Sequence, residues 1–141
     1  MSETVFSSAV LIACAQMRLL QHQAQEQFEL RVGGLLRERY AATVLNWSDD
    51  DVRRRVRYAI GRARHHGFSW QSSITGFVAI MAELGPRFDS HPSFARALSI
   101  RLPDEDERIS ALYDNITDED WADARGPASV SPWQHSGMTG N

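Results

Sequence analysis

The stretch SWQSSITGFVAIMAELGPRFDSHP, residues 69–92, decides the fold of this chain. Its apolar residues recur at steps of three and four, which is the spacing of one face of an α-helix. These residues are Trp70, Ile74, Phe77, Met81 and Leu84. The flanks of the segment are apolar as well, so the pattern predicts a core helix over residues 69–84 that is covered on more than one side.

Both ends of this helix carry boundary signals. The hydroxyl of Ser69 can accept a hydrogen bond from a free backbone N–H at the start. Gly85 can adopt the left-handed conformation just past the end, and the proline after it cannot continue a helix. In the loop that follows, we expect Phe88 to return to the core and Asp89 to bind loop N–H groups and fix the turn. Ser90 is expected to cap the next, short helix.

A long helix is expected upstream, after a partly extended lead-in over residues 2–12, where several residues are β-prone. It runs from about Ala13 to residues 40–42 and carries an apolar stripe at three- and four-residue steps. The stripe consists of Met17, Leu20, Ala24, Phe28, Val32 and Leu35. At Gly33 and Gly34, either the helix kinks or a neighbouring backbone packs against the bare surface.

The segment before the central helix predicts a further helix over residues 49–66. Ser48 and Asp51 have the spacing of a capping box, with Asp in place of the usual Glu or Gln. The inward face consists of Val52, Val56, Ala59, Ile60 and Ala63. Because only a short link separates this helix from the central one, the two are expected to be close neighbours.

The remaining segments complete an all-α prediction. Short helices are expected after residues 103–106 and after Thr117, which gives a single-domain bundle of about five or six helices around the central one. Residues 1–125 form the predicted helical domain. Gly, Pro, Ser and Thr dominate residues 126–141, which predicts a flexible tail in which Trp133 alone could anchor on a surface.

Charge and cysteine usage limit the classes of partner and the compartment. The net charge is −3, so no global attraction to nucleic acid or to an anionic membrane is expected. Cys14 is the single cysteine and cannot form an internal disulfide, which fits a reducing cytoplasm; a buried apolar thiol is expected there. Residues 1–15 hold no Lys or Arg, so the positive region of an export signal is missing and a cytoplasmic location is expected.

An arginine cluster on the helix over residues 49–66 is the most conspicuous charge feature. At 100° per residue, three of its arginines line up beside the apolar face, namely Arg53, Arg57 and Arg64, and two lie on the other flank, namely Arg55 and Arg62. The cluster has three interpretations: pairing within the chain, docking of an acidic protein partner, or binding of nucleic acid. Residues 101–125 hold nine acids against three arginines, which favours pairing and offers no second basic surface for nucleic acid. These five arginines are the candidate partner-binding residues.

No pattern indicates catalysis, a cofactor or a metal. His65 and His66 are adjacent, so on a helix they point about 100° apart and do not face one ion. The acidic clusters lie where helix caps belong, and no glycine-rich phosphate loop is present. We therefore expect no enzymatic activity, no cofactor and no metal site.

A set of short motifs resembles a group of small, uncharacterised helical bacterial proteins associated with type VI secretion effector gene clusters. The motifs are Tyr58-Ala59-Ile60, His66-Gly67-Phe68, Phe77-Val78-Ala79-Ile80-Met81, Leu84-Gly85-Pro86-Arg87-Phe88-Asp89 and Pro92. The resemblance covers roughly residues 10–115 and brings no catalytic residues; Ala59 stands where a glycine is expected.

This resemblance implies a secretion-linked role. The expected function is a cytoplasmic, non-enzymatic accessory, a chaperone or adaptor, that binds a secreted toxin effector. The alternative is an immunity protein that binds and neutralises a cognate toxin. The expected partner is a protein, without nucleic acid or membrane, and a homo-oligomer is compatible with the sequence. The candidate surfaces are the arginine face and the long N-terminal helix.

Overall fold

The computed structural model describes the backbone of residues 2–133 and the side chains of residues 9–133. Within these residues the chain is all-helical and has no strand, so the predicted all-α fold is confirmed. The elements are α1 (Ser2–Arg39), α2 (Asp49–His65), α3 (Gln71–Leu84), the 3₁₀ turn η1 (Phe88–Ser90), α4 (Pro92–Leu98), α5 (Glu105–Asn115) and α6 (Asp118–Arg125).

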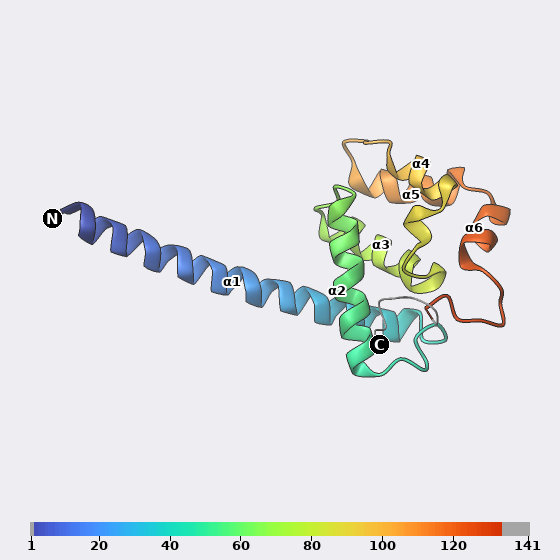
Figure 1. Cartoon of the computed structure of the whole chain (residues 1–141), viewed down its shortest axis with the longest axis horizontal. Coiled ribbons are helices and arrows are strands. Elements are labelled where there is room, and N and C mark those ends of the chain that lie inside the picture. Colours follow the sequence, from blue (N-terminus) through green and yellow to red (C-terminus); the bar gives the residue numbers. More distant parts are fainter. Residues whose placement is uncertain (1, 134–141) are drawn as a thin grey trace.

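Helix α3 lies at the centre of the molecule. It contacts α1, α2, α5 and α6, and α2 is its main neighbour, as the short link between them predicts. Nine of its residues are buried, and Gly85 ends it with φ 102° while its N–H donates to the carbonyl of Met81 at 2.7 Å. Figure 1 shows the shorter helices gathered into one group, here called the body, from which the N-terminal part of α1 extends.

The start of α3 differs from the prediction. Trp70 occupies the N-cap position and remains 43% exposed, and no hydroxyl caps the helix. The cap comes instead from Glu105 of α5, whose carboxylate accepts 2.7 Å hydrogen bonds from the backbone N–H groups of Ser69 and Trp70. It also accepts from the hydroxyls of Ser69 and Ser73. A carboxylate from a distant element therefore replaces the local cap, because it satisfies two free N–H groups at once.

The structure of α1 differs from one expectation and distinguishes between the two alternatives at the glycine pair. The extended lead-in over residues 2–12 is wrong, because a single helix runs from Ser2 to Arg39. No Gly or Pro interrupts residues 2–32, and strong helix formers dominate them. The helix also continues through Gly33 and Gly34. A β-carbon at Gly33 would lie 3.1 Å from Cγ1 of Val52, so the missing side chain serves the close approach of α2.

The turn after α3 is partly as expected. Phe88 returns to the core and is 1% exposed, which confirms its predicted position. Asp89 is buried and accepts hydrogen bonds from two side chains of the α2 end, Arg62 and His66, rather than from loop N–H groups. Ser90 does not cap α4. That position belongs to His91, whose Nδ1 accepts from the N–H of Ser93 at 3.2 Å.

Trp133 anchors the described part of the predicted tail. Its side chain is 2% exposed, its Nε1–H donates to the carbonyl of Ala82 at 3.1 Å, and its ring packs edge-on against Trp47 with a centroid distance of 5.3 Å. The rest of the predicted tail, residues 134–141, lies outside the described residues. Among the helices that the structure describes, none combines the length and apolarity needed to cross a lipid bilayer.

Candidate functional site

Helices α1 and α2 are held side by side by local features that the sequence encodes. Ser48 and Asp51 form the predicted capping box, with Ser48 Oγ accepting from the N–H of Asp51 at 3.0 Å and Asp51 Oδ2 accepting from the N–H of Ser48 at 3.2 Å. The hydrogen bond from the Ser48 backbone is the main cause that lowers the pKa of Asp51. The inward face of α2 is buried as predicted. This face places Val52 against Gly33 of α1.

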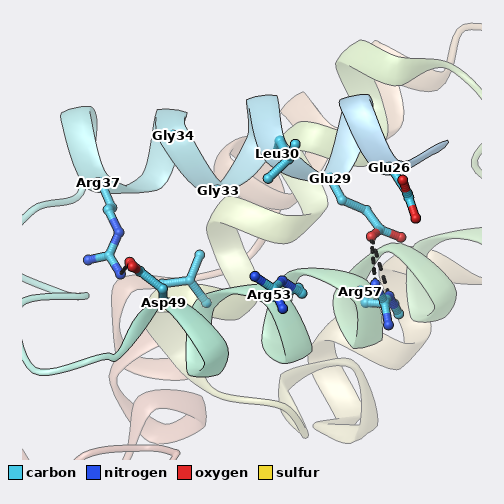
Figure 2. Close-up of a pocket in the computed structure, with 10 residues that line it drawn as sticks. Glu26, Glu29, Leu30, Gly33, Gly34, Arg37, Asp49, Arg53 and Arg57 are labelled. Carbon is cyan, nitrogen blue, oxygen red and sulfur yellow. Dashed lines mark hydrogen bonds and ion pairs between the residues drawn. The ribbon is translucent and has the colours of Figure 1, made fainter. Parts of the chain in front are cut away.

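An open groove of about 610 Å³ runs between these two helices. Figure 2 shows α1 on one side and α2 on the other, with charged side chains at the two ends and Leu30, the glycines and Arg53 between them. The groove is lined by Glu26, Glu29, Leu30, Gly33, Gly34, Arg37, Asp49, Val52, Arg53 and Arg57. We call this groove the α1–α2 groove.

Ion pairs close the two ends of the α1–α2 groove. At one end, Nη2 of Arg37 lies 2.8 Å from Oδ1 of Asp49. At the other end, the guanidinium of Arg57 donates to Oε1 of Glu29 at 3.2 and 3.3 Å. Glu29 is only 8% exposed and also accepts from Gln25 at 3.1 Å. The carboxylate of Glu29 is buried, whereas the side chain of Arg57 is 60% exposed, so this pair joins α1 and α2 at the edge of their contact.

The middle of the α1–α2 groove has a different character. Leu30 is 68% exposed there, and a β-carbon at Gly34 would meet no atom within 4 Å. Arg53 lies beside the open space over Gly34 and Leu30, here called the notch. Its side chain is 58% exposed, and its Nη1 lies 3.8 Å from Oδ1 of Asp50. The middle can therefore receive an apolar side chain and, next to it, an acidic group.

The five predicted arginines divide into two groups. Arg53, Arg57 and Arg64 lie along the side of α2 that faces α1, in the line that helical geometry predicts. Arg57 pairs with Glu29, and Nη2 of Arg64 donates to Oε1 of Gln25 at 2.7 Å.

Arg55 and Arg62 belong to the interior contacts of the body. The Arg55 guanidinium carbon lies 4.5 Å from the ring centre of Trp47 and 5.0 Å from that of Trp133, a cation–π arrangement. Burial is the main cause that lowers its pKa. Arg62 donates through Nε to Oδ2 of Asp89 at 2.9 Å. Both arginines make contacts within the body, and both also reach solvent. Arg55 lines a second open cavity of about 510 Å³, and the side chain of Arg62 is 33% exposed.

His66 joins the Arg62–Asp89 pair. Its Nε2 lies 2.9 Å from Oδ2 of Asp89, and its ring packs against Phe77. Burial lowers the pKa of His66, and the hydrogen bond with Asp89 opposes that shift. The group ties the end of α2 to the turn after α3. Within the side chains that the structure describes, no group of three His, Cys, Asp or Glu residues could hold a metal ion.

Sequence reasoning missed several residues of this region. Glu29 was expected on the polar face of α1, and Leu30 also lies away from the predicted stripe. Only the placement of α2 gives these two residues their roles. The Gly33-Gly34 pair was the available signal, since one of its two predicted meanings was close packing of a neighbour. Cys14 was expected to be buried but is exposed, because nothing in the body reaches that part of α1.

Comparison with protein-family models, with curated proteins and with solved structures gives no match to this chain. The resemblance to proteins of type VI secretion effector clusters therefore stays a prediction.

Proposed function

We propose that this protein is a non-enzymatic accessory, a chaperone or adaptor, that binds a segment of another protein in the α1–α2 groove. The observation that supports this proposal is the middle of the groove, where Leu30 and the bare backbone of Gly34 lie beside Arg53. Grooves between helices commonly receive an amphipathic helix or an extended segment through apolar anchors.

The chemistry of the groove specifies the partner segment. An apolar side chain of the partner fits over Gly34 and against Leu30, and an acidic side chain next to it pairs with Arg53. Arginine recognises carboxylates through two parallel hydrogen bonds, which gives this contact direction as well as charge. Following the sequence resemblance, we propose that the partner is a secreted toxin effector.

A matched pair of glycine substitutions tests the groove. Gly34→Leu fills the notch, and Gly61→Leu places the same side chain on α2 outside the groove. Neither β-carbon would meet an atom within 4 Å, so both variants are expected to fold and to gain up to about 1 kcal/mol from helix propensity. Any difference in function between them therefore comes from the blocked groove.

The variants are introduced into a deletion strain of the native bacterium, and the effector is followed by immunoblot. Deletion is expected to lower the effector level or its export while the cells stay resistant to the toxin. Wild type and Gly61→Leu restore the effector, and Gly34→Leu does not. An unchanged effector level after deletion, or full rescue by Gly34→Leu, would contradict the proposal. Sensitivity of the deletion strain to the toxin would indicate that the protein is an immunity protein rather than a chaperone.

A further inference from the structure

The outer part of α1 exposes apolar side chains that the rest of the chain does not cover. Every residue from 9 to 24, here called the arm, is exposed, and in Figure 1 this part of α1 lies away from the body. Its large apolar residues are Val10 at 44%, Leu11 at 68%, Ile12 at 60%, Met17 at 58%, Leu19 at 58% and Leu20 at 61% exposure. Arg18 is the only Lys, Arg, Asp or Glu in residues 9–20. Contiguous apolar surface of this kind marks an interaction site on a water-soluble body.

One face of the arm has the spacing of a helix-pairing surface. Apolar residues recur there at alternating steps of three and four, the pattern with which helices pair by knobs-into-holes packing. They are Val10, Ala13, Met17, Leu20 and Ala24, here called the seam. The seam combines the small residues Ala13 and Ala24 with the larger Val10, Met17 and Leu20, so a small residue of one seam can lie opposite a large residue of another.

The body limits how a second helix can lie on the seam. The same face of α1 continues to Phe28 and Leu35, which line a hollow together with Gln71 and Thr75 of α3. Helix α3 therefore occupies the continuation of the seam. A parallel partner in register would run into α3, whereas an antiparallel partner places the two bodies at opposite ends of the paired arms.

We infer that the arm binds the arm of a second copy of this chain, seam to seam and antiparallel, with the centre of the pair level with residue 15. In this register Val10 lies opposite Leu20 of the second copy, and Ala13 lies opposite its Met17. Both contacts occur twice because a two-fold interface is self-complementary.

The seam contains no charged residue, so it matches the equally uncharged seam of a second copy. Each copy carries a net charge of −3, and antiparallel arms place the two bodies at opposite ends of the pair, where they repel least. A helix that lies on a membrane surface usually carries a face rich in Lys and Arg, but residues 9–24 contain Arg18 alone. Stable interfaces use roughly 20–30 residues per partner. The arm offers fewer, so the pair is expected to dissociate on dilution.

Analytical ultracentrifugation of the purified full chain tests the pairing without any other protein. Two exposed leucines give a matched pair of variants: Leu20→Glu on the seam, at 61% exposure, and Leu45→Glu on the body, at 75%. Between about 1 and 100 µM, where modest interfaces dissociate, wild type and Leu45→Glu should shift from monomer to dimer. Leu20→Glu should weaken the dimer at least tenfold without loss of helical circular dichroism. A wild type that stays monomeric throughout, or a Leu20→Glu variant that dimerises equally well, would overturn the inference.

Spin-label distances test the antiparallel register. A label on the native Cys14, which is exposed, should lie close to its counterpart, because the axial offset is about 3 Å and paired helices lie about 8–10 Å apart. A label on Gln27→Cys in a Cys14→Ala background should give an axial separation of about 36 Å at 1.5 Å per residue. Short distances at both positions would contradict the antiparallel arrangement.

This inference is independent of the proposed function. Arm pairing uses residues 10–24 and is measured on the purified chain, whereas the groove is tested by Gly34→Leu in cells. A monomeric protein would leave the groove proposal standing, and an intact dimer with Gly34→Leu would leave the pairing standing.

Discussion

The two halves of α1 carry one apolar stripe but meet different surroundings. In the inner half, Phe28 and Val32 are 4% and 2% exposed, because α2 and α3 pack against them. In the outer half, Met17 and Leu20 belong to the same stripe and are 58% and 61% exposed. The comparison shows that a periodic stripe specifies which face of a helix is to be buried, but not whether the cover comes from the same chain.

The largest expected difference between the halves concerns stability. Phe28→Ala removes a buried aromatic side chain and leaves a cavity, which should cost about 3–5 kcal/mol in the free energy of unfolding. Met17→Ala removes an exposed side chain and should change that free energy by less than about 0.5 kcal/mol. Urea denaturation followed by circular dichroism, at a concentration where the arms are unpaired, measures both.

Similar losses in the free energy of unfolding for Phe28→Ala and Met17→Ala would contradict the difference between the two halves. A large cost for Met17→Ala in the dilute protein would mean that the arm folds against its own body, contrary to the structure. A small cost for Phe28→Ala would mean that the inner half is not part of the core.

A smaller effect on the free energy of unfolding is expected at acidic pH, and it should be confined to the body. Burial would raise the pKa of Glu105, but the hydrogen bonds it accepts from Trp70, Ser69 and Ser73 lower its pKa from its ordinary value of 4.5 to about 2. A carboxyl group whose pKa is depressed on folding stabilises the protein above its unfolded pKa. Stability should therefore fall as the pH drops from about 4.5 to about 2. Since α3 covers the inner half of α1, its loosening should expose Phe28.

Glu105→Gln and Glu107→Gln form the test of this acid response. Both remove one carboxylate from α5, but only Glu105 holds the start of α3. The loss of stability below pH 4.5, measured by urea denaturation at several pH values, should be reduced in Glu105→Gln. It should remain as in wild type in Glu107→Gln. An equal pH dependence in all three proteins would show that this cap contributes little.

Much of the fold could be predicted because its signals are local. The capping box of Ser48 and Asp51 and the five buried residues of α2 follow from spacing alone. The stop at Gly85 and the return of Phe88 are equally local. The missed cap of α3 is different, because it comes from Glu105, thirty-five residues after Trp70, and no local pattern reveals such a contact.

The sequence predicted where the arginines of the candidate site lie on α2, but not which of them bind residues of α1. Helical geometry placed Arg53, Arg57 and Arg64 on one flank, and the structure has them there. Which of them is engaged depends on Glu29 and Gln25 of α1, whose positions are set by the way the two helices pack. The stripe of α1 was likewise visible in the sequence, but its uncovered half was not, because coverage is a property of the whole fold.

Hydrogen exchange along α1 as a function of protein concentration tests most directly whether a second chain covers the outer half of the stripe. Amides of the inner half should be protected to the same degree at about 1 and 100 µM, since the body protects them at any dilution. Amides of residues 10–24 should exchange rapidly in the dilute protein and become protected in the concentrated one. Rapid exchange of the arm at both concentrations, or equal protection at both, would contradict the account.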